Sequence, residues 1–579
     1  NGSDLPLSTP GVYVLGVEAV GYGPEGYVVL GSTRTLLPFV PDQTTPVTLS
    51  WLWPLATWPG QTSDGVFLGD GLGREVSPRG RLRNILDIGT TAAGAVSWVV
   101  DPQVLQATSD MSRGYLVNKD GAIEPGNAQT AAGQWLGSAR DALSAPPRPK
   151  DRAADTTPPD VWALPYADND ADAAIRAGLD ADVVRSVTAA PPLVRNTLGR
   201  DPTGTIYWAP AGRITSAALS TLASTGVKAV VVREGALPPL VTPDFTPSSF
   251  GEFPTQFGPV RAIVVDTGLR TALGMPQANR AQILSARQRF LSELAFVSLE
   301  DPSMPRSLVV APGSTRWQPN PRLIRSLLTS IRVVPWARLA PLQDTLTETS
   351  GLVPRAPADY DERSKGREIS SGYMSRVVTA QESLTSLRSV AADPSSIAEP
   401  ASQALLRAES SAWRSRPSTG NDLVQSVQVG LDAQIAKVRI VPRDDVTFSG
   451  DRGSVPVTVA NNLDTPVTLG VQLAGSPSAR LTSDAIDNIS IDPGKRASLE
   501  VPVRLVGSDP LKVTVQLVNS KGQPFGQPST MELRTTAYSR AALWVAIGAA
   551  VLLVLLVIFD IVRRAHARRS RRAPDPVAA

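Results

Sequence analysis

Between Val47 and Leu339, short apolar runs alternate with longer stretches of helical periodicity, and most of the apolar runs end at a polar or turn residue. This alternation is typical of β/α units, in which each buried strand of a parallel sheet is followed by a helix. Eight runs predict strands, over residues 47–55, 96–102, 161–168, 205–210, 228–235, 261–268, 307–313 and 331–337. The pattern predicts a TIM-like (β/α) barrel of seven or eight strands over residues 46–345. An open doubly wound sheet is the alternative.

The periodicity changes after Pro354. Apolar residues recur at helical spacing from Met374 to Leu387 and from Leu423 to Ile435, and Leu405, Leu406 and Trp413 lie between these stretches. Two or three amphipathic helices are therefore predicted over residues 346–437. We expect them to pack on the barrel, and a groove for a partner is the alternative use of their apolar faces.

Strands are predicted at both ends of the predicted extracytoplasmic part, and alternation of apolar and polar residues begins at Val438. Residues 438–536 predict an immunoglobulin-like β-sandwich that ends close to a membrane. Residues 1–45 predict two or three strands around a turn at 21–26, which is too little for a stable sandwich. We expect them to be the C-terminal part of an incomplete β-domain, completed by a missing N-terminal portion or by a separate chain.

An uncharged run of nineteen residues, 541–559, is long enough to cross a bilayer as a helix, so residues 541–562 are predicted to be a transmembrane helix. A buried core helix is the alternative. Six arginines in the segment 563–579 follow the span, and only Arg534 and Arg540 lie just before it. The positive-inside rule therefore predicts a single-pass protein of the cell membrane with a cytoplasmic C-terminal tail and an extracytoplasmic N-terminal part. Because such a chain must be exported and no signal peptide is visible, we expect residues upstream of Asn1.

The composition excludes several kinds of chemistry. The net charge is +3 and the tail contributes +5, so the rest of the chain sums to about −2 and does not indicate nucleic-acid binding. The chain has no cysteine, and its one histidine, His566, lies in the tail. Disulfides, thiolate nucleophiles, Ser-His-Asp triads and histidine- or cysteine-ligated metals are therefore excluded from the outer part, and we expect no metal and no cofactor.

Acidic residues remain as candidate catalytic groups, because five of them follow predicted strands directly. In a barrel, the carboxyl ends of the strands build the active face, and two carboxylates with separated pKa values hydrolyse glycosidic bonds without histidine. Each acid equally fits a role in capping the helix that follows its strand. The candidates are Asp101, Asp168, Asp170, Glu234 and Asp266.

Aromatic residues and an arginine occur in the same strand regions, which is typical of a sugar-binding cleft. Trp51 and Trp208 belong to this set, and burial in the core is the alternative for every aromatic member. The residues predicted to bind a ligand are Trp53, Tyr166, Arg233 and Trp336.

Five segments carry a resemblance to a known family: WLWPLA, SPRGRLRNIL, VSWVVDPQVL, QWL and ALPYADND. With the sandwich and the terminal anchor, they resemble an uncharacterised family of actinobacterial membrane-anchored envelope proteins, a domain of unknown function. The resemblance implies a barrel similar in outline to those of glycoside hydrolases and deacetylases, although this chain lacks the histidines of the metal-dependent relatives. It also implies a place in the cell envelope, in association with peptidoglycan precursor export and wall assembly.

Three hypotheses follow. The first is a non-catalytic envelope protein whose barrel binds a glycan, a wall precursor or a membrane partner in cell-wall assembly. The second is a metal-independent, glycosidase-type hydrolase that uses two of the acids on the barrel face. The third is a periplasmic subunit of a larger complex with a polytopic membrane protein.

Overall fold

The computed structural model describes residues 7–41, 43–92, 94–144, 159–360, 366–442, 445–448, 450–507, 509–535 and 538–569. The chain divides into two compact units. Unit 1 comprises Asn1–Glu382 and Pro400–Val429, and unit 2 comprises Ser383–Glu399 and Gly430–Ala579.

Seven parallel strands form the central sheet of unit 1, in the order β12-β10-β9-β8-β5-β3-β13. Their bounds are β3 Val47–Leu55, β5 Ser97–Val100, β8 Asp160–Ala163, β9 Gly204–Trp208, β10 Ala229–Arg233, β12 Val260–Val265 and β13 Ser307–Val310. Two short strands extend the sheet: β11 (Phe250–Phe253) pairs antiparallel with β12, and β14 (Ala337–Leu339) pairs parallel with the first residues of β3.

The sheet curls until its two outer parallel strands meet. The backbone N–H of Asp266, which follows β12, donates to the carbonyl of Val309 in β13 over 3.2 Å. Alternate residues of all seven strands point inward and form one buried apolar cluster, which includes Leu52, Val99, Trp162, Ile206, Val231, Ile263 and Val309. Because strand side chains alternate between two faces, this single cluster is the inside of a barrel-like sheet.

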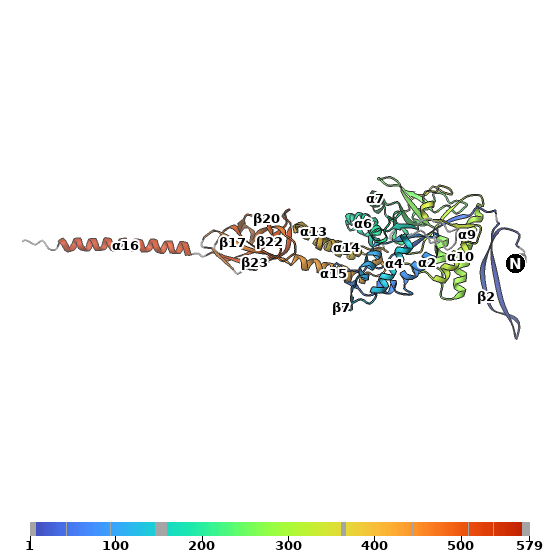
Figure 1. Ribbon diagram of the computed structural model, residues 1–579. Helices are drawn as coiled ribbons and strands as arrows, with labels where there is room; N and C mark the ends of the chain where they lie inside the picture. Colours follow the sequence, from blue (N-terminus) through green and yellow to red (C-terminus); the bar gives the residue numbers. More distant parts are fainter. Residues whose placement is uncertain are drawn as a thin grey trace, which may run out of the picture. The chain divides into compact units, whose positions relative to one another are not determined.

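Helices cover the outer face of the sheet (Figure 1). They pack against the other set of alternate strand residues, such as Leu49, Trp51 and Trp53, in a second apolar core. These helices are α2 Arg81–Thr91, α3 Pro102–Ser112, α4 Gln129–Ser144, α6 Asp180–Leu198, α8 Thr267–Leu273, α9 Arg280–Glu300 and α10 Pro321–Ile331. The helix α7 (Ser216–Ser224) follows β9. Shorter pieces are α1 Gly71–Val76, α5 Ala171–Arg176, α11 Leu342–Thr345 and a small sheet of β4 Phe67–Leu68, β6 Leu116–Lys119 and β7 Ala122–Pro125.

The first seven predicted strands of the β/α region each overlap one of the seven parallel strands. The prediction of a strand over 331–337 is wrong in its position. Ile331 ends helix α10 with its side chain buried, Val333 is exposed in the turn, and the strand β14 begins only at Ala337. The apolar residues at the end of an amphipathic helix were therefore read as the start of a strand.

The predicted helices are present as α13 (Ser371–Val390), α14 (Ser395–Ala408) and α15 (Pro417–Ile435). Trp413, which was grouped with Leu405 and Leu406, lies instead in a separate 3-10 turn, η5 (Ser411–Arg414). The part of this region that belongs to unit 1, residues 400–429, packs on the barrel-like sheet through Arg407, which donates to the carbonyls of Gln61 (2.7 Å) and Thr62 (3.3 Å).

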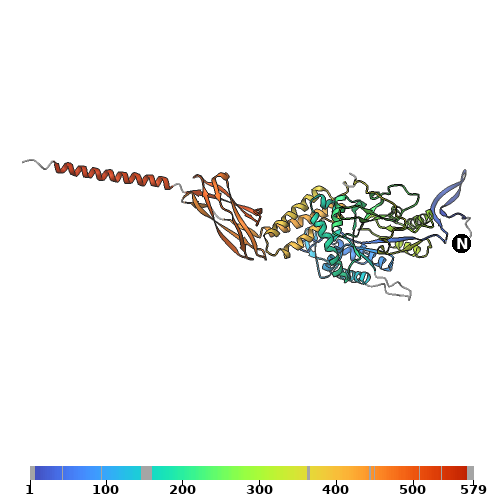
Figure 2. The same ribbon diagram turned by 90° about the horizontal axis from the view of Figure 1, so that it is seen from above.

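Unit 2 contains a sandwich of two mainly antiparallel sheets, whose strands are drawn in orange in Figure 2. One sheet has the order β15-β17-β21-β19 and the other β16-β23-β22-β18-β20. The bounds are β15 Val438–Val441, β16 Val446–Phe448, β17 Arg452–Asn461, β18 Val467–Ser476, β19 Leu481–Ser483, β20 Ile486–Ile491, β21 Arg496–Leu505, β22 Leu511–Val518 and β23 Pro524–Thr535. Alternate valines of β17 and β22, such as Val457 and Val515, are buried, as the predicted period of two requires.

The last described element of unit 2 is α16 (Tyr538–Arg569), whose stretch Trp544–His566 is long and apolar enough to cross a membrane. Its apolar side chains are exposed, unlike those of a core helix. The residues of the predicted basic tail beyond Arg569 lie outside the described residues.

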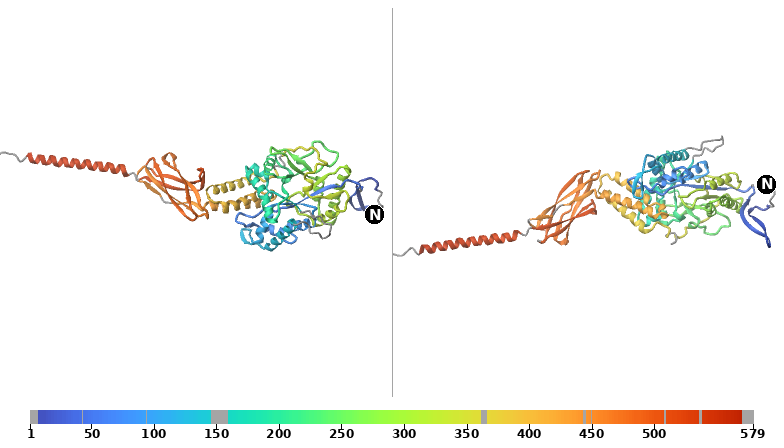
Figure 3. Two further views of the ribbon diagram at one scale, coloured as in Figure 1. Left: turned by 45° about the horizontal axis from the view of Figure 1, so that its top comes forward. Right: turned by 90° about the horizontal axis from the view of Figure 1, so that it is seen from below.

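The N-terminal strands of unit 1 form a separate two-stranded antiparallel hairpin of β1 (Gly11–Gly23) and β2 (Gly26–Phe39), drawn in dark blue in Figure 3. The hairpin packs on α9, and most of its residues are exposed. Its turn lies at the predicted position between Gly23 and Gly26.

Candidate functional site

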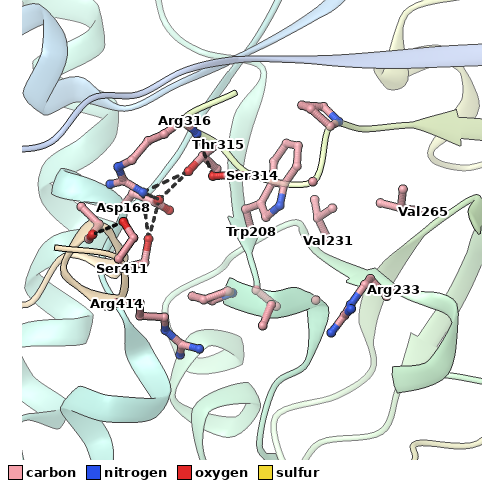
Figure 4. A pocket seen from close by; sticks show the side chains of 18 of the residues that line it. Asp168, Trp208, Val231, Arg233, Val265, Ser314, Thr315, Arg316, Ser411 and Arg414 are labelled. Atoms are coloured by element: carbon pink, nitrogen blue, oxygen red, sulfur yellow. Dashed lines mark hydrogen bonds and ion pairs between the residues drawn. The ribbon is translucent and has the colours of Figure 1, made fainter. Parts of the chain in front are cut away.

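A pocket of about 290 Å³ lies at the carboxyl ends of the parallel strands, and Figure 4 shows its wall. The loops after β8, β9, β10, β12 and β13 contribute to it, together with the turn η5 from the helical region. Its polar and aromatic lining residues are Trp58, Asp168, Trp208, Arg233, Arg270, Ser314, Thr315, Arg316, Ser411, Arg414 and Ser415. The pocket therefore occupies the face where barrel proteins of this kind place their ligands.

Among the described residues that line this pocket, Asp168 is the only one with a carboxylate. Its Oδ2 accepts three hydrogen bonds, from Thr315 Oγ1 (2.8 Å), Arg316 Nη1 (2.7 Å) and Ser411 Oγ (2.7 Å). The backbone at Ala167 and Asp168 has φ values of 60° and 50°, which are uncommon for residues other than glycine. This turn directs the carboxylate toward the arginine, and the whole group occupies one side of Figure 4.

Arg316 joins three parts of unit 1. Besides Asp168, its guanidinium donates to the carbonyl of Thr57 (2.8 Å) and to the hydroxyl of Ser410 (3.0 Å). The Arg316 and Asp168 side chains are both almost completely buried. Each charge therefore depends on the other, because a buried charge without a partner is strongly unfavourable.

A second ion pair lies behind the wall. Arg414 forms two parallel hydrogen bonds to Asp170, Nε to Oδ2 (2.5 Å) and Nη2 to Oδ1 (2.8 Å). Asp170 also caps α5 by accepting from the N–H of Ala173 (3.3 Å). Its carboxylate is completely buried and is fully occupied with structural contacts.

Asp101 lies in the layer beneath Asp168. It is the N-cap of α3, and its Oδ1 accepts from the N–H groups of Gln103 (3.0 Å) and Ala167 (2.9 Å). Its Oδ2 is buried without a hydrogen-bond partner among the described residues. Complete burial, and then the nearby charge of Asp168, raise the pKa of Asp101 to about 7.

Arg233 lies on the other side of the pocket from Asp168 in Figure 4, and Arg270 also lines the pocket. The stem of Arg233 lies over Gly212, where an added Cβ would come within 2.3 Å of Arg233 Cγ. Gly212 has a φ of 72°, so the turn and the close approach of Arg233 both require glycine there. Arg270 comes from α8, and its Nε is buried without a hydrogen-bond partner in the described part of the chain.

Two tryptophans complete the wall. Trp208, at the end of β9, belongs to the apolar cluster inside the sheet together with Val231 and Val265, and all three line the pocket. Trp58 is half-buried, and the guanidinium of Arg416 lies 3.8 Å from its ring centroid. The floor is therefore apolar and aromatic, while the rim is dominated by arginine.

The turn 409–411 fixes the helical region to the loop that carries Asp168. The N–H of Asp170 donates to the carbonyl of Glu409 (2.8 Å), and Asn169 Nδ2 donates to Glu409 Oε2 (2.9 Å). Burial raises the pKa of Glu409 well above its ordinary value, and the neighbouring carboxylate of Asp182 raises it further. The pocket is thus assembled from two distant parts of the sequence.

The structure separates the five acids that the sequence suggested. Asp168 alone lines the pocket, and Asp101, Asp170 and Asp266 cap helices α3, α5 and α8. Burial raises the pKa of Asp266 to about 6, and Glu234 is an exposed residue that accepts a hydrogen bond from Thr267 (3.1 Å). The capping alternative therefore describes three of the five.

Of the four residues suggested to bind a ligand, only Arg233 lines the pocket. Trp53 lies in the outer apolar core, where its Nε1 donates to the carbonyl of Ile85 (3.0 Å), because odd-numbered residues of β3 face the helices. Tyr166 is buried between Gln106 (2.6 Å) and Arg407 (2.8 Å), both bonded to its hydroxyl.

Trp336 packs on the outer core just before β14, at the end of the sheet where β3 begins. It does not line the pocket. The prediction for Trp336 is wrong for the same reason as the predicted strand 331–337. The residue precedes β14 and does not lie within it.

Sequence reasoning missed Arg270, Arg316, Arg414 and Ser411. Arg270 and Arg316 follow the predicted strands 261–268 and 307–313 by a few residues, so the rule used for the acids would have found them if it had included cations. Arg414 and Ser411 carry no such signal, because they reach the pocket only through the packing of residues 400–429.

The groups that line the pocket are mainly hydrogen-bond donors and apolar surface. The carboxylate of Asp168 accepts three hydrogen bonds on one oxygen, and no second carboxylate from the described residues lines the pocket. No group of three or more histidines, cysteines or acids that fits a metal ion was found among the described residues. The available groups are guanidinium donors, hydroxyls and aromatic surface.

Comparison with solved structures finds distant likenesses. An α-amylase from Thermotoga maritima matches with a TM-score of 0.46 and 10% identity, covering 68% of this chain and 94% of that one. A 4-α-glucanotransferase from Thermococcus litoralis matches with a TM-score of 0.42 and 11% identity, covering 82% and 84%. Neither likeness is strong enough to carry an argument about activity.

No match was found among the curated proteins. A family of unknown function, DUF6049, matches residues 32–576, which include the pocket, the sandwich and the apolar helix. Because this match spans nearly the whole chain, the protein belongs to the DUF6049 family.

Proposed function

We propose that this protein is a membrane-anchored, extracytoplasmic protein that binds an envelope glycan in its pocket without cleaving it, and so supports cell-wall assembly. The observation that carries the proposal is the pocket wall itself. It combines an aromatic and apolar floor at Trp208 with guanidinium and hydroxyl donors, and its one carboxylate is held by Thr315, Arg316 and Ser411.

The hydrolase alternative has less support. Glycosidases of the two-acid type place two carboxyl groups about 5–10 Å apart across an open cleft. Here Asp101 is completely buried beneath Asp168 and does not line the pocket, and Asp170 is bound to Arg414. The described residues of the wall therefore supply no second reacting carboxylate.

The location of the protein is part of the proposal. The stretch Trp544–His566 is apolar enough to span a bilayer, and the arginines after it in the sequence favour a cytoplasmic tail. In this topology the pocket faces the cell envelope, where glycans and their precursors are found.

A binding and cleavage experiment tests the function. The full chain, purified in mild detergent, is incubated with purified envelope glycan, and both bound material and released fragments are measured by chromatography and mass spectrometry. We expect retention of glycan with no new fragments. The variant Arg316→Gln should lose retention, because it loosens the Asp168 group, whereas Arg322→Gln on the exposed face of α10 should retain glycan. Fragments released by the unmodified protein would overturn the proposal.

A second candidate function, as a subunit of a larger membrane complex, is favoured by the hairpin of β1 and β2. This hairpin exposes large apolar side chains on both faces, including Val14, Val17, Tyr22, Tyr27 and Leu30. Exposed apolar surface and free strand edges are typical of a site where another polypeptide adds to the sheet.

Gentle extraction tests this candidate. A stoichiometric polypeptide should co-purify with the unmodified chain and be lost from Val17→Asp, but remain with Val333→Asp, which places the same charge at another exposed valine of unit 1. A strictly monomeric unmodified protein would exclude this role.

A further inference from the structure

We propose that the ligand of the pocket is an anionic saccharide, whose phosphate or carboxylate group is recognised by Arg270 together with Arg233. This inference rests on the proposed function and names the class of glycan that the pocket selects.

The charge of the wall is the first argument. The described lining residues include four arginines and one carboxylate, so their formal charge is +3, and the adjacent Asp170 lowers this to +2. Asp168 and Asp170 are each bound to one arginine of the wall, Arg316 and Arg414. An enclosed surface with this excess attracts an anion and raises its local concentration.

Arg270 supplies the second argument. Its guanidinium lines the pocket, and its Nε is buried without an acceptor among the described residues. A buried donor without a partner is rare in proteins and costs free energy, unless a ligand accepts from it. Its planar fork of donors matches the paired oxygens of a carboxylate or a phosphate.

The remaining wall explains why the anion would be carried by a sugar. Trp208, Val231 and Val265 form an apolar floor, and Figure 4 shows Trp208 and Val231 between the Asp168 group and Arg233. A sugar ring presents C–H groups to such a floor and hydroxyls to the rim. The volume of about 290 Å³ is at the small end for ligand pockets, which suits one charged sugar residue and not a long segment of chain.

The test compares three probes on the full chain in detergent: glucose 1-phosphate, glucuronate and glucose. Binding is measured by titration calorimetry, or by tryptophan fluorescence because Trp208 lies in the wall. We expect at least one anionic probe to bind about tenfold or more tightly than glucose. Its affinity should fall as salt is added. The two anionic probes distinguish a phosphate from a carboxylate ligand.

Two variants connect this preference to Arg270. Arg270→Gln should remove the preference for the anionic probe over glucose, while Arg270→Lys should retain part of it because the charge remains. Arg322→Gln, an exposed arginine of α10, is the matched control and should bind as the unmodified chain does. A thermal melt of each variant verifies that it is folded.

The outcomes separate this inference from the proposed function. Equal binding of glucose and both anionic probes, independent of salt, would overturn the anionic ligand and leave glycan binding in place. Retention of an anionic preference in Arg270→Gln would also overturn it. Absence of binding for all three probes, together with no retention of envelope glycan, would overturn both.

Discussion

At the scale of single residues, the pocket depends on carboxylates whose roles differ by their contacts. Asp168 lines the wall and neutralises Arg316, while Asp101 lies below it with one oxygen unpartnered. Both follow strands that end at the same edge of the sheet. Their neighbours, and not their residue type, decide which one holds a charge.

Replacement of Asp168 by asparagine should destabilise unit 1 by about 3 kcal/mol, because it leaves the buried guanidinium of Arg316 without its counter-charge. Asparagine keeps the size and tolerates the positive φ, so loss of the charge is the main change. The loss of unfolding free energy is measured by denaturant unfolding of the full chain, with tryptophan fluorescence as the signal.

The control is Asp87→Asn, which breaks the exposed pair of Asp87 with Arg83 (3.0 Å). It should cost less than about 1 kcal/mol, as exposed ion pairs do. Equal losses for the two variants would contradict the structural role given to Asp168.

Asp101 should give the stability of unit 1 a pH dependence. Its pKa is about 7 in the folded protein against an ordinary value of 3.8, so between these values the folded state holds a proton that the unfolded state has released. The contribution of Asp101 to the free energy of unfolding therefore falls as pH rises toward 7, by at most about 1.4 kcal/mol per pH unit. Asp101→Asn should remove this decline, and at pH 8 the variant should be more stable than the unmodified chain.

The free energy of unfolding of the unmodified chain and of Asp101→Asn, measured from pH 5 to pH 8, tests the direction of this pH dependence. Asp301→Asn is the control, because hydrogen bonds from Ser303 lower the pKa of Asp301 and its effect falls below this range. A difference between Asp101→Asn and the unmodified chain that does not change with pH would contradict the assignment.

At the scale of elements, tight packing of α2 on the sheet explains the burial of two tryptophans. A Cβ added at Gly89 of α2 would come within 2.3 Å of Trp98 and 2.7 Å of Trp53 Nε1. Glycine therefore lets the helix approach β3 and β5 closely, although glycine is unfavourable inside a helix.

Gly89→Ala should destabilise unit 1 by about 2 kcal/mol, because the overlap with two indole rings outweighs the gain in helix propensity. Gly137→Ala in α4 is the matched variant: nothing lies within 4 Å of its added Cβ, so it should stabilise by about 0.5–1 kcal/mol. The melting temperatures of both variants, compared with that of the unmodified chain, test this prediction. A higher melting temperature for Gly89→Ala would contradict the close packing.

At the scale of the whole molecule, the proposed topology is open to a direct labelling experiment, because the chain contains no cysteine. In cells that express the protein, Ser520→Cys, in the exposed turn after β22, should react with a membrane-impermeant maleimide without lysis. Ala578→Cys, near the C-terminus, should react only after lysis. The reverse pattern would place unit 2 in the cytoplasm and remove the basis for an envelope ligand.

Much of the architecture could be predicted from local patterns. The seven parallel strands, the helices after Pro354, the alternating strands of the sandwich and the apolar helix all follow from periodicity or from an uninterrupted apolar run. The pattern failed at residues 331–337, because a few apolar residues at a helix end resemble a short strand.

The candidate site was less predictable. Asp168 is predicted because it lies at a strand end, and Arg233 because it occurs in the same strand regions as the aromatic residues. Strand position does not tell a pocket residue from a helix cap, as Asp101 and Asp266 demonstrate. Trp53 was misjudged because an aromatic residue in a strand faces either side of the sheet, and only the packing of α2 decided which.

The sequence by itself determined the order of the elements, the apolar anchor and the lack of histidine and cysteine chemistry before the tail, because these depend on neighbouring residues or on composition. Only the tertiary structure decided that Asp168, Arg270, Arg316 and Arg414 share one pocket. They are brought together by the curl of the sheet and by the docking of residues 400–429, and both depend on contacts between residues far apart in the chain.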